Sequence, residues 1–389
     1  MRQRLVRLYE IAVEDREIVP PESPVAAKRP YLGLEQIEAQ TGRIVSYDGN
    51  SAEGKSTTFA FDDRHVLYGK LRPYLNKVAI PDRAGRCSTE IVPLLPVNVD
   101  RSFLALLLRS DRVVRSAMSE KTGSRMPRAD MDALLGIEIG IPPLIEDQRR
   151  IAAHLKAQLG EIDTARQAAQ AQADDIALLR RRVLAEVFTG VEDAPRKRIG
   201  DHATTTSGST PSRGNKAYWT PAEVPWVKTA EIDFASITHV QERISLVALA
   251  ECSLAVLPAK TVLVAITGEG KTRGRSAVLE IPATNNQHSV AILPNEIWDP
   301  YFMQLWLQTS YHDLRDLSEG RGGSRSALSG VQIKALEVPA PSREVQTVLA
   351  CRAQNALREL QALSAANQAQ RTELERLPQR LLALAFGEA

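Results

Sequence analysis

The feature that most constrains this chain is an internal repeat whose period is about half of its length. The matching fragments are short, but they occur in the same order in both halves. They pair residues 31–37 with 226–232, 123–125 with 323–325, 141–148 with 340–346, and Phe188 with Phe386. Such an order predicts two homologous halves that fold by the same plan.

Each half begins with roughly 140 residues in which short apolar runs alternate with Gly, Pro, Ser and Asn. Runs such as 64–68 and 261–266 are typical of strands, so this front part predicts mixed β structure with a few helices.

Each half ends in about 45 residues with almost no Gly or Pro. Spacings of three and four residues persist there over many turns, which predicts a coiled-coil helix of roughly 60 Å at 1.5 Å per residue. Pro378 lies inside the second helix and predicts a kink or a new segment. The seam positions are Gln148, Ile151, Leu155, Gln158, Ile162, Ala165, Ala169, Gln172, Ile176, Leu179, Val183 and Glu186, and then Gln346, Leu349, Ala353, Ala356, Leu360, Leu363, Asn367, Gln370, Leu374, Leu377, Leu381 and Leu384.

These patterns predict an α/β protein with mixed α+β heads at opposite ends of an antiparallel two-helix coiled coil, related by a pseudo-twofold internal repeat. We expect the helices to pair with each other because the connection at 189–200 leads into a whole second head. The predicted segments are 1–143 for the first head, 144–190 for the first helix, 191–341 for the second head and 342–389 for the second helix.

Composition excludes several classes of protein. The chain has 389 residues and three cysteines, Cys87, Cys252 and Cys351, so neither a disulfide framework nor a zinc site is expected. The charged N-terminus and the short apolar runs predict no signal peptide and no membrane span. Net charge is only +2, but residues 64–128 contain thirteen Lys and Arg against five Asp and Glu. Clustered positive charge favours a polyanion as partner, with a solvated basic face as the alternative.

The sequence contains no convincing pattern of catalytic residues. Residues 49–56 fit the P-loop pattern G-x-x-x-x-G-K-[ST], but the residues that follow alternate as in a strand, whereas a P-loop opens a helix. The six histidines are scattered singly, and no signature for amino-methylation of bases, metal-dependent hydrolysis or a serine nucleophile is present. The chain is therefore predicted to be non-catalytic.

Basic and aromatic residues in Gly-containing loops are the candidate recognition equipment, because Arg and Lys can contact phosphates and guanine edges. The alternative is that these are solvated turns and core aromatics. The candidate DNA-binding residues are Lys70, Arg72, Tyr74, Lys77, Lys121, Ser124, Arg125, Arg128, Arg213, Tyr218, Trp219, Lys228, Thr229, Lys271, Arg273, Arg275, Arg321, Ser324 and Arg325.

The chain resembles the specificity subunits of type I restriction-modification systems. Between residues 207 and 232 the run Ser-Gly-Ser-Thr-Pro-Ser-Arg, then Tyr-Trp, then Pro-Trp-Val-Lys-Thr is similar to the opening of a target-recognition domain. Residues 66–77 and 87–90 resemble the corresponding segment of the first domain, and residues 141–151 resemble the entry into the family's spacer helix. The resemblance covers nearly the whole chain and occurs twice; residues 1–29 match it less well.

The resemblance implies that each head reads one half of a split double-stranded DNA target while the helices act as a ruler. It also implies a non-catalytic subunit with no cofactor of its own, and the few, widely spaced cysteines favour a reducing cytoplasm as its location. Two DNA-methyltransferase (modification) subunits would dock on the helices and bind S-adenosylmethionine, and motor-nuclease subunits would join for restriction.

Three alternatives stay open on the sequence alone: a scaffold whose coiled coil only joins proteins, an ATP-dependent enzyme that uses residues 49–56, and a specificity subunit that serves a different methyltransferase system.

Overall fold

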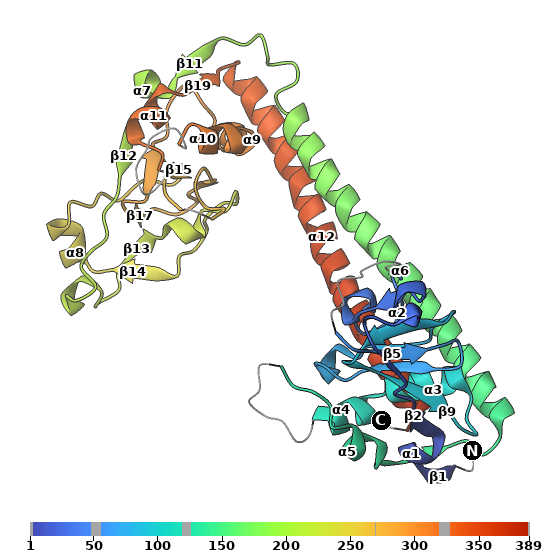
Figure 1. Ribbon diagram of the computed structural model, residues 1–389. Helices are drawn as coiled ribbons and strands as arrows, with labels where there is room; N and C mark the ends of the chain where they lie inside the picture. Colours follow the sequence, from blue (N-terminus) through green and yellow to red (C-terminus); the bar gives the residue numbers. More distant parts are fainter. Residues whose placement is uncertain (1–2, 48–55, 119–125, 269, 319–326, 388–389) are drawn as a thin grey trace. The chain divides into compact units, whose positions relative to one another are not determined.

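A computed structural model describes residues 3–47, 56–118, 126–268, 270–318 and 327–387 (Figure 1). Contacts divide the chain into two units. Unit 1 comprises Met1–Ala171 with Asn367–Ala389, and unit 2 comprises Gln172–Ala366. Each of the two long helices therefore contributes one part to each unit.

Unit 1 contains small sheets and short helices, followed by the first long helix. Its elements are β1 (Arg4–Arg7), α1 (Leu8–Ile11), β2 (Ala12–Glu14), β3 (Ile18–Val19), α2 (Pro24–Lys28), β4 (Tyr31–Leu32), η1 (Leu34–Gln36), β5 (Thr58–Phe61), β6 (Val66–Gly69), η2 (Pro73–Leu75), β7 (Val78–Ala79), β8 (Gly85–Ser88), β9 (Ile91–Pro96), α3 (Arg101–Leu108), α4 (Asp111–Met118), α5 (Met131–Leu135), β10 (Glu138–Ile141) and the start of α6 (Ile145–Glu186).

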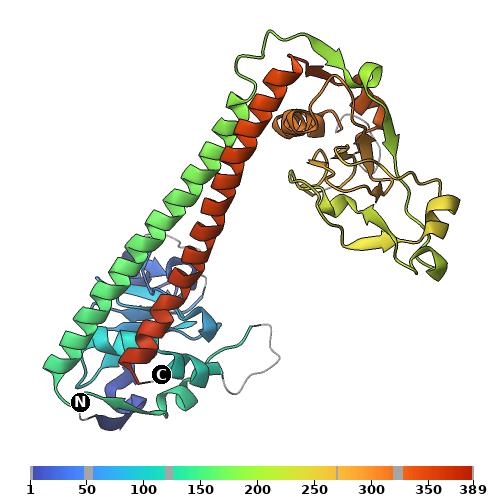
Figure 2. The same cartoon turned by 180° about the vertical axis from the view of Figure 1, so that it is seen from behind.

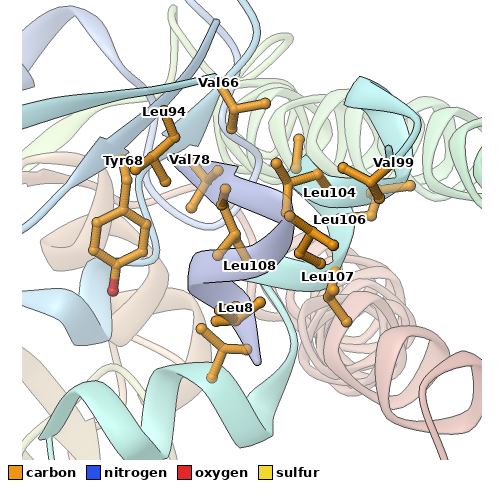
Figure 3. Packing of buried hydrophobic residues seen from close by; sticks show 14 of the residues in the cluster. Leu8, Val66, Tyr68, Val78, Leu94, Val99, Leu104, Leu106, Leu107 and Leu108 are labelled. Atoms are coloured by element: carbon orange, nitrogen blue, oxygen red, sulfur yellow. The ribbon is translucent and has the colours of Figure 1, made fainter. Parts of the chain in front are cut away.

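The main core of unit 1 lies between a sheet and helix α3. The sheet has the order β2-β9-β6-β7, a second sheet has the order β3-β5-β8-β4, and β1 pairs with β10. Figure 3 shows Val66, Tyr68 and Leu94 of the first sheet beside Leu104 and Leu108 of α3. All five are buried, and burying one such side chain stabilises the fold by roughly 1.5–3 kcal/mol.

Unit 2 follows the same plan and ends with the second long helix. Its elements are β11 (Arg196–Arg198), α7 (Ile199–His202), β12 (Thr205–Ser207), η3 (Lys216–Tyr218), β13 (Val224–Val227), η4 (Thr229–Glu231), β14 (Glu242–Ile244), α8 (Leu246–Glu251), β15 (Val262–Ala265), β16 (Ser276–Val278), β17 (Thr284–Asn285), β18 (Ser289–Ile292), α9 (Pro300–Thr309), α10 (Tyr311–Asp316), α11 (Gly330–Ala335), β19 (Glu337–Pro339) and the start of α12 (Arg343–Ala385).

Two of the three sheets of unit 2 repeat those of unit 1, and in the third, β14-β13-β17 against β3-β5-β8-β4, only the parallel pair is repeated, counted over the described residues. The order β12-β18-β15-β16 matches β2-β9-β6-β7, and the pair β11-β19 matches β1-β10. The parallel pair β4-β8, with Tyr31 opposite Arg86, matches the parallel pair β13-β17, with Trp226 opposite Thr284. The predicted pairing of residues 31–37 with 226–232 is thus confirmed at the level of individual strands. Mixed heads joined to two long helices are also confirmed.

Helices α6 and α12 lie side by side in both views and run antiparallel (Figures 1 and 2). In unit 1, Leu382 of α12 packs in one cluster with Leu155 of α6, and Asn367 Nδ2 donates to the carbonyl oxygen of Ala169 at 3.0 Å. In unit 2, Val183 of α6 and Leu357 of α12 pack against the same core. No helix among the described residues is both long and apolar enough to cross a membrane.

Only part of the predicted seam is buried. The seam positions form two lines along each helix, each with a spacing of seven residues. On one line of α6, Leu155, Ala169 and Ile176 are buried, whereas Leu179 on the other line is 45% exposed. In α12, the alternate positions Leu363, Leu377 and Leu384 are likewise exposed, by 51%, 37% and 69%. The two helices therefore face each other mainly along one of the two predicted lines, unlike a regular two-stranded coiled coil, in which both lines are buried.

Pro378 does not end α12, which continues to Ala385. A proline inside a helix leaves the carbonyl four residues earlier without its N–H donor, and that carbonyl belongs to Leu374. Arg166 of α6 supplies the missing donor, because its Nε donates to the oxygen of Leu374 at 3.2 Å. Its Nη2 also donates to the oxygen of Glu375 at 3.1 Å. The helix pair in unit 1 is thereby tied together at the proline.

A duplicated glutamine joins each head to the long helix that follows it. Gln148 is 1% exposed, accepts from the Asp100 amide and donates to the Pro142 carbonyl, both at 2.8 Å. Gln346 is fully buried and accepts from the Asp299 amide at 2.8 Å. It also donates to the carbonyls of Ile297 at 2.8 Å and Pro341 at 2.9 Å.

Each head also forms an aromatic contact with a phenylalanine at the end of a long helix, which is α12 for unit 1 and α6 for unit 2. Phe386, just after α12, meets Phe103 in unit 1, and Phe188, just after α6, meets Phe302 in unit 2, with ring centroids 5.5 and 5.3 Å apart. Each head is therefore held by a glutamine from one long helix and a phenylalanine from the other.

Candidate nucleic-acid interface

In unit 1, the residues after β6 pair with the residues around Arg128. The carbonyl oxygen of Lys70 accepts from the Ala129 amide at 2.8 Å, and the Arg72 amide donates to the Pro127 carbonyl at 2.7 Å. This short ladder brings together Lys70, Arg72 and Arg128, three of the predicted DNA-binding residues that are distant in the sequence.

The three cations of this ladder differ in their partners. Arg128 forms an ion pair with Glu90 at 2.9 Å, and this hydrogen-bonded carboxylate raises the pKa of Arg128. Arg72 is in the left-handed region with a φ of 53°, and its buried Nε has no hydrogen-bond partner in the part of the chain that the structure describes. Lys70 has no ion pair with any described residue. Among the three, Lys70 is the side chain most available to a ligand.

Tyr74 and Lys77 follow on the same segment but are placed differently. Tyr74, in η2, is 46% exposed, and its carbonyl accepts from Gln40 Nε2 at 2.9 Å. Lys77 Nζ donates to the Leu34 carbonyl at 2.5 Å, and burial lowers the pKa of Lys77. Lys77 therefore acts as an internal tie between η1 and β7, and Tyr74 is the exposed member.

Unit 2 repeats the ladder with different side chains. The carbonyl of Ile266, just after β15, accepts from the Leu328 amide at 2.8 Å, as the carbonyl of Lys70 accepts from the Ala129 amide. In both units the strand end is thus paired with a residue that lies soon after the repeated Gly-Ser-Arg sequence. The architecture is duplicated, although the lysine is replaced by isoleucine.

Arg213 belongs to an internal cluster in unit 2. Its guanidinium carbon lies 3.8 Å from the ring centroid of Trp219 and 5.4 Å from that of Trp226. It pairs with Glu242 at 2.5 Å, and Lys228 Nζ pairs with the same carboxylate at 2.8 Å. Hydrogen bonds from Arg213 and then Lys228 lower the pKa of Glu242. The cluster holds the segment before η3 against β13 and β14.

Two other predicted residues of this region also have internal partners. The Tyr218 hydroxyl donates to Glu251 at 2.9 Å, and this hydrogen bond raises the pKa of Tyr218. Thr229 Oγ1 donates to Asn286 Oδ1 at 2.9 Å. Both side chains therefore stabilise the local fold.

The predicted set at 271–275 lies on a turn that is braced from α10. Arg315 Nη1 donates to the carbonyls of Gly270 at 2.8 Å and Arg273 at 3.3 Å. Arg273 is 3% exposed, and Arg275 pairs with Asp233 at 2.6 Å. Lys271 is exposed and is the side chain of this turn that can reach a ligand.

Six predicted residues lie outside the described residues: Lys121, Ser124, Arg125, Arg321, Ser324 and Arg325. Residues 49–55 of the P-loop pattern lie outside them as well.

Sequence reasoning missed the carboxylates that partner the predicted cations, which are Glu90, Asp233 and Glu242. Each stands 29 to 42 residues from its arginine in the chain, and no local spacing could have paired them.

Comparison with known proteins decides the family. The sequence model of the type I restriction modification DNA specificity domain matches residues 39–170 and again residues 192–373. The chain belongs to this family.

Two curated members of the type I specificity family are similar to part of this chain. The MjaIX specificity subunit of Methanocaldococcus jannaschii is 32% identical over 160 residues, which are 40% of this chain and 35% of that protein. The EcoDI specificity subunit of Escherichia coli is 26% identical over 161 residues, or 41% of this chain and 36% of that protein. The chain thus matches about a third of the length of these relatives.

Two solved structures share the fold over nearly the whole chain. One comes from work on complex assembly and conformational transition of the type I R-M system, with a TM-score of 0.77, 21% identity, and coverage of 99% of this chain and 97% of that one. The other is the HsdS subunit from Thermoanaerobacter tengcongensis, with a TM-score of 0.62, 23% identity, and coverage of 99% and 96%.

Proposed function

We propose that this chain is the sequence-specific DNA-binding specificity subunit of a type I restriction-modification complex. The observation that carries the proposal is the double match of the specificity-domain family, once in each half of the chain. We assign residues 1–143 and 191–341 to the two target-recognition domains, and residues 144–190 and 342–389 to the spacer helices. In the proposal each head reads one half of a bipartite target, and the paired helices set the spacing.

The proposed contact surface begins at the ladder after β6 in unit 1 and at its counterpart in unit 2. Lys70 and Lys271 are suited to phosphate contacts because they have no carboxylate partner among the described residues. Exposed Tyr74 can stack or donate a hydrogen bond. The basic loops carry the other proposed contacts, from Lys121, Ser124, Arg125, Arg128, Arg321, Ser324 and Arg325.

The internally partnered residues take a supporting part in the proposal. Arg213, Trp219, Lys228, Arg273 and Arg275 would hold the recognition segments in place. The ion-paired ones would contact DNA only if a phosphate replaced their carboxylate partner, Glu242 or Asp233. Arg72, Lys77, Tyr218 and Thr229 would act in the same supporting way.

Two methyltransferase subunits are the proposed partners, and they would bind S-adenosylmethionine and perform the methylation. This chain would supply no catalytic group and no cofactor site. Motor-nuclease subunits would complete a restriction assembly, and the complex would work on double-stranded DNA in the cytoplasm.

Two heads discriminate better than one. Each wrong base pair costs about 1–3 kcal/mol, so a single short half-site competes poorly with genomic DNA. A second head on the same chain binds at a high effective concentration and multiplies that discrimination.

Co-expression with methyltransferase subunits, followed by genome-wide mapping of methylated adenines, tests the proposal. We expect one bipartite methylated sequence that disappears when this chain is omitted. Arg125→Ala and Arg325→Ala should each reduce methylation of that sequence. Methylation that persists without this chain, or activity of this chain alone on a duplex, would refute the proposal.

A further inference from the structure

Each unit contains a cavity where its head meets a long helix, and several of the helix residues that line the two cavities occupy equivalent positions. The unit 1 cavity measures about 500 Å³ and lies between α3, residues 41–44 and α6. The unit 2 cavity measures about 530 Å³ and lies between α9, residues 233–236 and α12. Both volumes suit a small-molecule ligand.

The glutamine joints establish which positions correspond. Since Asp100 matches Asp299 and Gln148 matches Gln346, the α3 and α6 residues of the first cavity align with residues of α9 and α12 in the second. Lining residues then correspond as Ala105 with Gln304, Leu106 with Leu305, Arg109 with Gln308, Lys156 with Gln354, Leu159 with Leu357, Gly160 with Arg358, and Asp163 with Gln361.

The two cavities have diverged in charge. Four glutamines line the unit 2 cavity, where Arg180 and Arg358 are balanced by Asp233 and Glu280. Four cations and one carboxylate line the unit 1 cavity, where the apolar part of the wall is formed mainly by Ile44, Val78, Ile80, Leu106 and Leu159. The cations are Arg43, Arg101, Arg109 and Lys156, and the carboxylate is Asp163. Only the first cavity therefore has a net positive charge.

The unit 1 cations are incompletely neutralised. Arg43 pairs with Glu38 at 3.0 Å, and Asp163 shares its charge with Arg166 at 3.5 Å. Arg101 Nη1 donates to the Pro81 carbonyl at a long distance of 3.5 Å. Among the residues that the structure describes, neither Arg101, Arg109 nor Lys156 has a carboxylate within ion-pair distance.

Arg109 is the most deeply buried of these cations, and its donors are only partly satisfied. It is 8% exposed, its Nη2 donates to the Gln40 carbonyl, and its buried Nε has no acceptor among the described residues. Burial lowers the pKa of Arg109 to about 10, although nearby Asp163 acts in the opposite direction. Arg109 therefore places a largely buried positive charge without a carboxylate partner in the wall of this cavity, where an anion would offset part of the cost of burying it.

We propose that the unit 1 cavity binds a small organic anion, with a carboxylate or phosphate head at Arg109, Arg101 and Lys156 and an aliphatic body against Leu106 and Leu159. A guanidinium matches either head group through its planar fork of donors. The described lining offers no aromatic ring on which a base could stack, so an aliphatic body is favoured over a nucleoside. Binding would brace α3 and residues 41–44 against α6 within unit 1, and it does not depend on the proposed DNA recognition.

The test uses the full-length chain with octanoate, octyl phosphate and uncharged 1-octanol as probes, below their micelle-forming concentrations. Hydrogen exchange read by mass spectrometry should show octanoate or octyl phosphate slowing exchange in peptides that cover 41–44, 101–109 and 156–163. The corresponding unit 2 peptides, 233–236 and 300–308, are the internal control. Comparing the two anions identifies which head group the site prefers.

Two variants give unit 1 the residues of its twin. Arg109→Gln should weaken binding of the anion at least tenfold. Lys156→Gln, at an exposed position where folding is not at risk, should weaken it several-fold. Arg358→Gln in the other cavity should leave it unchanged. Equal protection by 1-octanol, equal protection of both cavities, no protection by either anion, or unaltered binding by the two unit 1 variants would each overturn the proposal.

Discussion

The duplicated glutamine joint allows a prediction whose size follows from counted contacts. Gln148→Ala removes one acceptor from the Asp100 amide, in a partly buried site, and one donor from the Pro142 carbonyl, in a buried site. A buried group left unpaired costs about 1–3 kcal/mol, and the partly buried Asp100 amide lies at the lower end, about 1 kcal/mol, so we expect the joint to lose about 2–4 kcal/mol. Because about 1.4 kcal/mol is a factor of ten, protection against local opening should fall roughly 30- to 700-fold.

Hydrogen exchange of peptides that contain Asp100 measures this loss directly. Gln346→Ala leaves a third group unpaired, the Ile297 carbonyl, and should produce a larger effect at Asp299. Gln167→Ala, at an exposed position of α6, is the matched control for the change in helix propensity. If Gln148→Ala exchanged no faster at Asp100 than the control did, the hydrogen bonds would contribute nothing to the joint and the reasoning would fail.

Three further predictions concern charge and the helix pair. The pKa of Glu242 is lowered by its cationic partners Arg213 and Lys228. The ionised carboxylate therefore contributes its full stabilisation above the unfolded pKa near 4.3, and this stabilisation is lost as pH falls through the lower folded value. Trp219 fluorescence should stay constant above about pH 5 and change only in acid, and a change near pH 7 would contradict this. Arg166→Ala should destabilise unit 1 by about 1–2 kcal/mol in urea unfolding followed by circular dichroism, and adding Pro378→Ala should recover part of the loss. If Arg166→Ala cost the same free energy with proline and with alanine at position 378, Arg166 would not act through the proline. Lys70→Ala should weaken DNA binding by the assembled complex and reduce its salt slope by about 1, whereas an unchanged slope would remove Lys70 from the contact surface.

The repeat could be predicted because short matching fragments occur in the same order in both halves of the sequence. Residues 31–37 and 226–232 fold into equivalent strands and 3-10 turns in both units, since the same short pattern meets the same parallel partner strand. The long helices were equally predictable, because continuous heptads with almost no glycine or proline leave few other ways to bury apolar residues. Gln148 and Gln346 were visible as part of the repeat, but their role as a joint was not.

By itself, the sequence determined that there are two like heads and two long helices, because secondary structure and duplication depend on residues close in the chain. Only the tertiary structure decided which cations are free. In the sequence, Arg213, Lys228 and Lys70 are equally plausible DNA contacts. In the structure, Arg213 and Lys228 both form ion pairs with Glu242, whereas Lys70 has no such partner among the described residues. Whether a charge meets another charge depends on segments far apart in sequence that folding brings within 4 Å, and no local pattern records that distance.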